Sequence, residues 1–222
     1  MFEERPASKR SLTKRELVRG VGVNDAPYVI RYKENGKYMR CPYYQQWDNM
    51  LSRAYNVNYH RTRPSYVGCS VDPRWHKFTD FRKWMEKQDW EGKCLDKDIL
   101  VQGNKCYSPD TCIFVSNNIN VLMSDAGRTR KNGLPKGVNK NGKRYKAEMY
   151  RGDASSKHIG TYDTPEEAHT MYTIKKCEVI KEVAAEQEPR LRDALIRHAK
   201  ALEDTLVDRT EQEDTEQERL GV

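Results

Sequence analysis

The strongest constraint on the fold is a change in the spacing of apolar residues near position 164. Between 144 and 150 apolar and polar residues alternate, which is the period of a strand with one buried face. The segment Thr164-Pro165-Glu166-Glu167 then has the form of a helix capping box, with proline at the first helical position. Beyond it, apolar residues recur at helical spacing as far as Ala184. The chain must therefore pass from a β-sheet into a long helix.

Two turn signals separate the strands of this sheet. Asn141-Gly142 is typical of a type I′ hairpin turn, because both central positions of that turn need positive φ. Gly152-Asp153 predicts a second turn, before a strand from 157 to 162. We therefore expect a three-stranded antiparallel sheet packed on one long helix. The alternation assigns the middle strand to two faces: Tyr145, Ala147 and Met149 toward the helix, and Arg144, Lys146, Glu148 and Tyr150 outward.

A separate, aromatic-rich unit precedes this one, since all four tryptophans lie between 47 and 90. Pro42 suits the first position of a helix, and aromatic residues follow it at helical spacing. A second helix is predicted from 78 to 85. Residues 95–101 are typical of a strand, and Ser108-Pro109 predicts a helix that continues to Ile119. The fold class that follows is α+β.

Composition divides the chain into five segments. The aromatic-rich unit lies between a polar, basic start and a stretch rich in Gly, Arg and Lys, and the chain ends in an acidic run. The expected segments are a flexible basic arm (1–26), the first unit (27–125), a basic linker (126–133), the second unit with a helical extension (134–202) and an acidic tail (203–222).

The positive charge is concentrated in the body of the chain. The whole chain carries +7, and residues 203–222 hold eight acidic and two basic residues, a net of −6, so residues 1–202 carry +13. Between Arg128 and Arg151 nine Lys and Arg residues accompany one acidic residue, Glu148. Clustering of one sign of charge favours a polyanionic partner over general solubility.

Several classes of protein are excluded. No apolar run reaches the roughly 20 residues that span a bilayer. Residues 1–20 are polar and basic and contain no secretory signal, so we expect a cytoplasmic protein without membrane contact. The six cysteines include no C-x-x-C pair, and Cys94, Cys106 and Cys112 with His76 match no common zinc spacing. We therefore expect reduced, mostly buried thiols and no zinc.

The outer face of the predicted sheet carries Arg144, Lys146, Tyr150 and His158. Cationic and planar side chains at every second position suit a β-sheet that lies in the DNA major groove, which is wide enough for strands. A charged sheet face that only contacts water is the alternative. The excess of positive charge favours double-stranded DNA.

This region resembles the Apetala/ethylene-response-factor DNA-binding domain. The resemblance covers about 45 residues and is carried by Gly137-Val138, by Tyr145 to Met149 and above all by the run from Ile159 to Ala168. It implies that the outer sheet face enters the major groove. The resemblance implies these contact residues: Lys136, Asn139, Lys140, Arg144, Lys146, Glu148, Tyr150 and His158. Asn139, Tyr150 and His158 replace arginine or tryptophan of that family, so its preferred target sequence does not carry over.

The basic linker should add contacts without sequence preference. A chain segment that contains glycine does not hold side chains firmly at base edges, so contacts to phosphates are expected. The residues concerned are Arg128, Arg130 and Lys131.

A second candidate site lies between residues 95 and 114. Asp96 and Asp98 end a predicted strand, and Asn104 follows in a loop. Carboxylate and amide oxygens are suitable ligands for Mg²⁺ or Mn²⁺, which can polarise a scissile phosphate. The alternative is an exposed strand edge followed by an ordinary turn.

Residues 28–120 resemble the HNH-type homing endonucleases of phages and bacteria, which have a ββα-metal fold. The resemblance is carried by Trp47, Met50, the spacing from Gly68 to Phe81 and the acidic segment itself. It implies catalytic roles for Asp96, Lys97, Asp98 and Asn104. Lys97 occupies the position of the family's histidine base, and a lysine is normally protonated at neutral pH and cannot accept a proton from water. Thr111 or Asp110 occupies the position of the helix ligand.

The expected function is therefore a phage-type, metal-dependent homing endonuclease that binds and cleaves DNA. A non-catalytic DNA-binding regulator or host-takeover factor on a degenerate nuclease scaffold is the alternative. A third possibility is a protein-interaction factor whose acidic tail mimics DNA.

Overall fold

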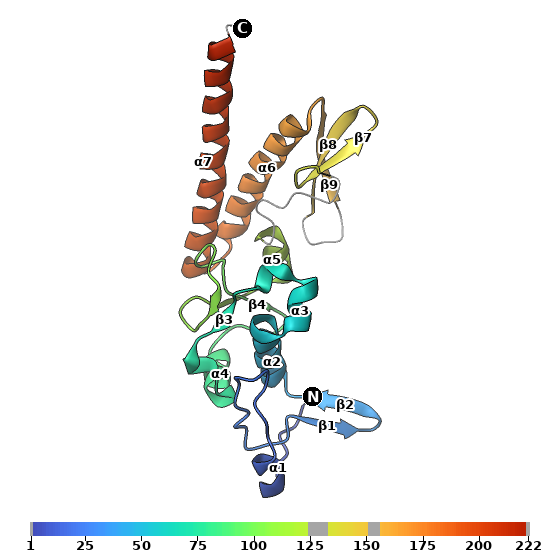
Figure 1. The fold of residues 1–222 in the computed structure, drawn as a ribbon, viewed down its shortest axis with the longest axis vertical. Helices are drawn as coiled ribbons and strands as arrows, with labels where there is room; N and C mark the ends of the chain where they lie inside the picture. Colours follow the sequence, from blue (N-terminus) through green and yellow to red (C-terminus); the bar gives the residue numbers. More distant parts are fainter. Residues whose placement is uncertain (1, 124–132, 151–155, 221–222) are drawn as a thin grey trace. The chain divides into compact units, whose positions relative to one another are not determined.

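The computed structural model describes residues 2–123, 133–150 and 156–220, with only the backbone given for Tyr150, Ser156 and 209–220. The protein has an α+β fold and divides into two compact units, Met1–Phe114 and Val115–Val222 (Figure 1). The division lies earlier than the boundary expected near residue 125. The reason is that α5 (Asn117–Met123) packs against α6 (Pro165–Ala185) of the second unit.

The N-terminal segment is packed against the first unit, which corrects the expectation of a flexible arm at 1–26. It contains the short helix α1 (Lys9–Thr13). Arg15 donates hydrogen bonds to the carbonyl groups of Asn24, Ala26 and Tyr28. A β-bridge joins Val23 to Lys77. These long-range backbone contacts hold a segment whose own composition offers few apolar anchors.

Two helices and a set of aromatic rings form the core of the first unit. The predicted helices are confirmed as α2 (Pro42–Tyr55) and α4 (Phe78–Met85). Trp47 is fully buried, and its indole N–H donates to the carbonyl of Trp75 at 2.7 Å. The remaining helical elements are α3 (Val57–Thr62) and the short 3₁₀ turns Pro64–Tyr66 and Pro73–Trp75.

Three small sheets complete this unit. β1 (Arg31–Glu34) pairs with β2 (Lys37–Arg40), β3 (Ser70–Val71) with β5 (Cys106–Tyr107), and β4 (Cys94–Asp96) with β6 (Ile113–Val115). The strand predicted over 95–101 is shorter than expected, because β4 ends at Asp96.

The helix predicted from Ser108 does not form, and a helix begins only at Asn117. The capping chemistry is present, since Ser108 Oγ accepts the backbone N–H of Thr111 at 3.2 Å. It supports a single turn, because the following residues Ile113–Val115 pair with β4. Apolar and β-branched residues of this kind favour a strand.

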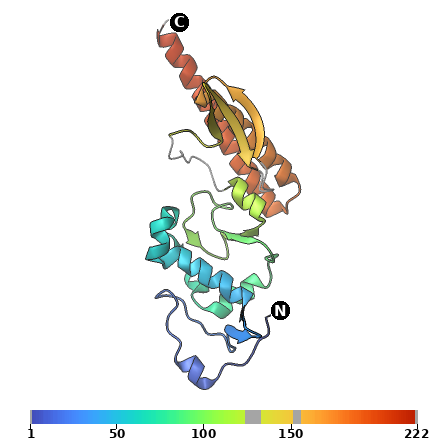
Figure 2. The ribbon, with the colours of Figure 1, turned by 90° about the vertical axis from the view of Figure 1, so that its right-hand side faces the viewer.

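The second unit confirms the sheet and helix predicted from sequence. β7 (Val138–Asn141), β8 (Arg144–Tyr150) and β9 (Ser156–Tyr162) form an antiparallel sheet in that order. Thr164 caps α6, because its Oγ1 accepts the backbone N–H of Glu167 at 3.1 Å. Figures 1 and 2 show α6 along one side of the sheet, with α7 (Pro189–Leu220) on the other side of α6.

The first hairpin of this sheet turns one residue later than predicted. Asn141 pairs with Arg144, so the loop residues are Gly142 and Lys143. Gly142 has φ +63°, and Lys143 is not among the non-glycine residues with positive φ. Glycine with positive φ at the first loop position is the pattern of a type II′ turn instead of type I′.

The acidic end of the chain continues the helix α7 to Leu220. The acidic tail expected at 203–222 thus has a helical backbone as far as Leu220. The packed part of α7 precedes the acidic run, where Leu191, Ala194, Leu195 and Ala199 are buried. Across the described ranges, none of the helices has the length and apolar character to cross a bilayer.

We expect Gly137→Ala to destabilise the second unit more than Gly133→Ala does. Both glycines have positive φ, +78° and +76°, so an alanine should cost about 1–2 kcal/mol at either position. A Cβ on Gly137 would lie 2.1 Å from the ring of Tyr172, whereas the space around Gly133 is open. Moving that ring should add about 1–3 kcal/mol. Urea unfolding measures both variants, and equal losses would contradict the contact.

Candidate nucleic-acid interface and acidic loop

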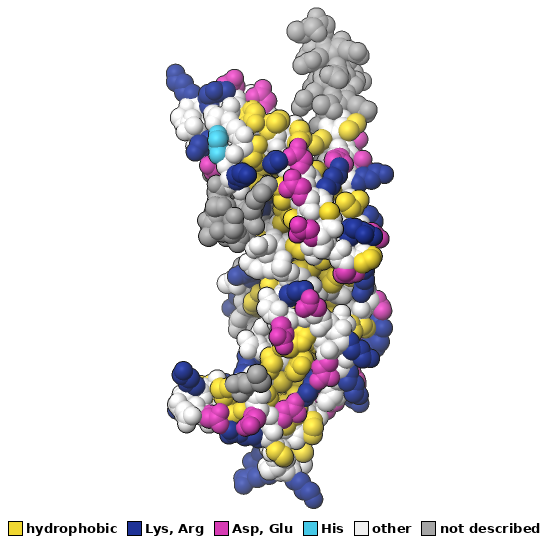
Figure 3. Space-filling model, turned by 180° about the vertical axis from the view of Figure 1, so that it is seen from behind, with side chains coloured by type: hydrophobic (Ala, Val, Ile, Leu, Met, Phe, Trp, Pro, Cys, Tyr) yellow, Lys and Arg dark blue, Asp and Glu magenta, His cyan; other side chains and the backbone are white. Residues whose placement is uncertain are grey.

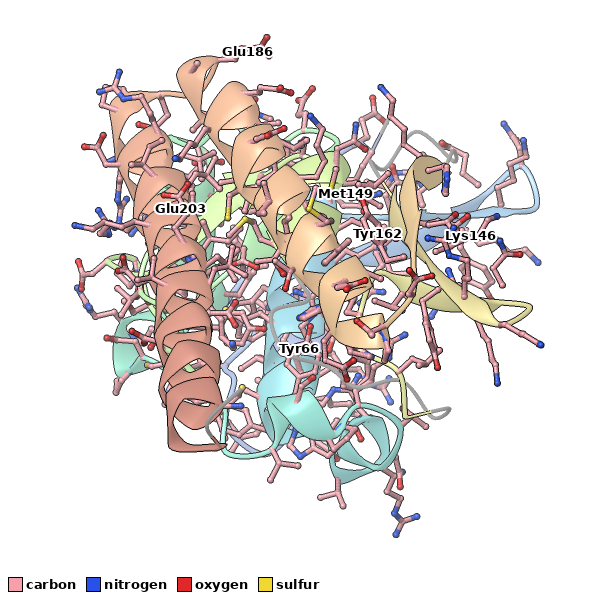
Figure 4. All side chains as sticks on the ribbon, turned by 90° about the horizontal axis from the view of Figure 1, so that it is seen from above. Tyr66, Lys146, Met149, Tyr162, Glu186 and Glu203 are labelled. Atoms are coloured by element: carbon pink, nitrogen blue, oxygen red, sulfur yellow. The ribbon has the colours of Figure 1, made fainter. Side chains whose placement is uncertain are left out.

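The packing of the sheet on α6 defines its inner face. Val138, Ala147 and Met149 are buried, and α6 contributes the buried side chains of Ala168 and Tyr172. Figure 4 shows Met149 on the side of the sheet toward α6 and Lys146 on the far side. The face assignment derived from alternation is therefore correct for β8, within the part of the strand whose side chains are described.

The outer face carries a small network around one carboxylate. Lys146 lies opposite Asn139 in the register of β7 and β8. Glu148 accepts a hydrogen bond from Asn139 Nδ2 at 2.8 Å and lies 3.4 Å from Lys146 Nζ. Glu148 therefore aligns an amide and an ammonium group side by side on the solvent-facing surface of the sheet.

A β-bulge brings His158 onto the same face. The register shifts between Ala147 and Glu148, so that Ala147 lies opposite Gly160 and Glu148 lies opposite His158. Ile159 is the extra residue on β9. Strict alternation from Gly160 would turn His158 toward the helix, and the bulge redirects it outward. His158 is exposed.

Arg144 is held at the end of the outer face. Its Nε lies 2.7 Å from Asp163 Oδ1, and its guanidinium also donates to the carbonyl of Thr161 at 3.1 Å. The side chains of Arg144 and Asp163 are 53% and 77% exposed. An ion pair this exposed contributes little stability in water, so a phosphate or a base edge can replace the carboxylate.

Two of the expected contact residues lie elsewhere. The exposed Lys140 pairs with Tyr145, so it shares the face of Tyr145 and not that of Lys146. Lys136 is half-buried before β7, where its carbonyl accepts from His169 Nδ1 at 3.0 Å. Burial, together with the charge of the nearby Lys176, lowers the pKa of Lys136 to about 8. Lys176 itself is 4% exposed, and the sequence pattern of α6 gave no sign of it.

Four further expected contacts cannot be placed by their side chains. Tyr150 belongs to β8, opposite Ser156, but only its backbone is described. The linker residues Arg128, Arg130 and Lys131 lie outside the described residues.

The acidic loop brings Asp96, Lys97, Asp98 and Asn104 together. Asp96 Oδ1 accepts the backbone N–H groups of Asp98 and Ile99, both at 2.8 Å. Asp98 Oδ2 lies 3.2 Å from the buried ammonium of Lys97. Burial and the neighbouring carboxylate of Asp98 raise the pKa of Asp96 to about 6. Two carboxylates that disfavour each other's charge create an environment that a cation would relieve.

Asn104 closes the loop by bonds to the backbone. Its amide nitrogen donates to the carbonyls of Lys97 at 2.6 Å and of Cys106 at 2.7 Å. Its Oδ1 accepts the backbone N–H of Cys106 at 3.0 Å. Lys97 Nζ in turn donates to the carbonyl of Asn104 at 3.0 Å. Asn104 therefore shapes the loop that presents the two aspartates, and a role as metal ligand would need a second bond to the same oxygen.

The two histidines of the first unit contact backbone carbonyls. The Nε2 atoms of His60 and His76 contact the backbone carbonyls of Arg53 at 2.8 Å and Val71 at 3.0 Å. Across the described ranges, three or more His, Cys, Asp or Glu side chains nowhere form a group that could hold a metal. Cys112 is buried, and burial raises the pKa of its thiol to about 12.

Comparisons with protein-family models, with curated proteins and with solved structures find no match for this chain. Its function must therefore be inferred from the chemistry of its own residues.

We expect Asp96→Asn to change how stability depends on pH. The pKa of Asp96 is raised from 3.8 to about 6 in the folded protein, so its protonated form favours folding. That contribution is fully present below about pH 4 and is lost as the pH rises through about 6. Asparagine keeps the Oδ1 acceptor and cannot ionise. Urea unfolding across this range should show a fall for the unmodified protein that the variant lacks.

The exposed Asp89, changed to asparagine, is the control and should leave the fall in place. Curves of the same shape for the unmodified protein and Asp96→Asn would contradict the raised pKa.

Proposed function

We propose that this protein binds double-stranded DNA through the outer face of the β7–β8–β9 sheet. One observation carries the proposal: the sheet is covered by α6 on one side, and its other side presents an aligned row of polar and charged groups. We define this row as the reading face. It comprises Asn139, Arg144, Lys146, Glu148 and His158.

The chemistry of the reading face suits base edges in the major groove. Lys146 and Arg144 can donate to guanine, Asn139 can pair with adenine, and Glu148 can accept from the amino group of cytosine. The groove is wide enough to admit strands, and the basic body of the chain supplies attraction to phosphates. The weak ion pair of Arg144 is readily exchanged for such contacts.

We expect Lys146→Ala to weaken binding to a selected DNA site by about 1–3 kcal/mol and to relax discrimination at particular base pairs. Lys140→Ala is the matched control, because Lys140 is a lysine of the same hairpin on the opposite face. It should change affinity little. Fluorescence anisotropy with a selected and a scrambled duplex measures both variants. A larger loss of affinity or of discrimination with Lys140→Ala would show that the face assignment is inverted.

We propose metal-dependent cleavage of DNA phosphodiesters as a second candidate function, centred on Asp96 and Asp98. The observation that favours it is that Asp96 and Asp98 lie in one loop, where burial and the neighbouring carboxylate of Asp98 raise the pKa of Asp96. Mg²⁺ commonly uses one or two protein carboxylates and completes its shell with water and phosphate oxygens. The Nε2 atoms of His60 and His76 contact backbone carbonyls, so a metal-bound water would supply the nucleophile. A non-catalytic DNA-binding regulator is the alternative.

A plasmid assay separates these two possibilities. With Mg²⁺ or Mn²⁺ the unmodified protein should nick or cut the plasmid, and Asp96→Asn should abolish this without loss of DNA binding. Asp89→Asn, which removes an exposed carboxylate of the same unit, should cut normally. Absence of cutting by the unmodified protein with either ion would leave the regulator as the function.

A further inference from the structure

β1 and β2 form a hairpin in the first unit. Asn35 and Gly36 form its loop with φ of +47° and +79°, which is the pattern of a type I′ turn. Figure 1 shows the hairpin extending from the rest of the first unit, and Figure 3 shows both basic and acidic side chains over it.

The two faces of this hairpin differ in chemistry. Cross-strand partners share a face, and Arg31 pairs with Arg40 while Lys33 pairs with Tyr38. One face therefore carries three cations, one tyrosine and no acidic residue. We define it as the basic ribbon face: Arg31, Lys33, Tyr38 and Arg40.

The opposite face is covered by the N-terminal segment. The ring of Phe2 lies 5.5 Å from that of Tyr32, and the guanidinium of Arg5 lies 3.8 Å above the ring of Tyr32. Arg5 also forms an ion pair with Glu34. These contacts hold the hairpin on the first unit from one side and leave the basic ribbon face toward solvent.

The basic ribbon face retains charge that the fold does not use. Arg40 pairs with Asp48 at 2.6 Å, but across the described part of the chain no ion pair involves Arg31 or Lys33, and both are exposed. The guanidinium carbon of Arg31 lies 4.0 Å from the centre of the Tyr38 ring, and Lys33 Nζ lies 5.9 Å from it.

Tyr38 is 64% exposed at the surface of this two-stranded hairpin. Such a hairpin is only marginally stable alone. The ring contacts the cations of Arg31 and Lys33 on one side of the ribbon. Two aligned, unneutralised cations beside an exposed ring complement a polyanion and match no feature of an apolar or cationic partner.

We propose that the basic ribbon face is a second DNA-contacting element, in which Arg31 and Lys33 bind phosphates of the duplex. This inference rests on the proposed DNA-binding function and extends it from the second unit to the first. A contact of this kind carries no sequence information and adds affinity to every duplex alike. Its role would be to hold DNA at the unit that contains the acidic loop, while the reading face determines the sequence.

The test compares two lysines of the same hairpin. Lys33→Gln removes a cation from the basic ribbon face, and Lys37→Gln removes one from the opposite face, where Lys37 pairs with Glu34 in the register. Binding of the full chain to a fluorescent DNA duplex of arbitrary sequence is measured over a series of salt concentrations. Lys33→Gln should reduce the slope of log affinity against log salt by about 0.9, and Arg31→Gln with Lys33→Gln by about 1.8.

The same slope corresponds to a loss of affinity of about eightfold per contact at about 0.1 M salt. Lys37→Gln should bind like the unmodified protein, and unchanged thermal melting of all variants shows that the hairpin remains folded. Equal effects of Lys33→Gln and Lys37→Gln, or no effect of the double variant, would overturn the inference. The same measurement is made with an RNA duplex of the same sequence. If the variants lost affinity for the RNA duplex alone, the inference would also be overturned, since the partner would then be RNA.

The outcome is separable from that of the proposed function. If the unmodified protein binds DNA and Lys146→Ala weakens that binding, the reading face stands whatever the ribbon variants do. If the unmodified protein binds no duplex DNA at any salt concentration, the proposed function fails, and this inference fails with it.

Discussion

The close approach of the sheet to α6 is the contact on which the second unit depends. Gly137 lies directly beneath the ring of Tyr172, and Val138 and Ala147 are completely buried at the same interface. Small residues at these positions let the helix lie close to the sheet. Because one face is sealed in this way, charged residues of the middle strand can lie only on the other face. The candidate interface is therefore a direct consequence of how the core is packed.

Charged residues of this unit have two different roles: some orient neighbouring side chains, and others can attract a polyanion. Glu148 is the acidic residue of the reading face, and its bonds to Asn139 and Lys146 give both groups a defined direction. Lys136 and Lys176 differ from Lys146 of the reading face, because burial lowers the pKa of each to about 8. Lysines that are withdrawn from solvent contribute less to long-range attraction than their number suggests. The positive charge available to a polyanion is thus that of the exposed Lys and Arg residues.

The first unit uses the same residue types for a different purpose. The side-chain amide of Asn104 donates hydrogen bonds to backbone carbonyls, and Asp96 caps the turn that follows β4. These bonds hold the loop together and use only one oxygen of Asp96. The second oxygen of Asp96 and the carboxylate of Asp98 belong to the same loop. A hydrogen-bonded loop that brings two carboxylates together is a suitable place for a divalent ion. It is also a stable turn without one.

The sequence by itself determined the local features: the strands and capped helix of the second unit, the faces of β8 and the helices α2 and α4. These depend on periodicity and on residues close together in the chain. Only the tertiary structure decided that a bulge turns His158 outward, that residues 113–115 pair with β4 instead of extending a helix, and that the N-terminal segment is packed. Asn-Gly pairs illustrate the limit, since Asn35-Gly36 forms a type I′ turn and Asn141-Gly142 does not. Register, bulges and long-range backbone pairing follow from which surfaces meet, and a pattern of neighbouring residues does not contain that information.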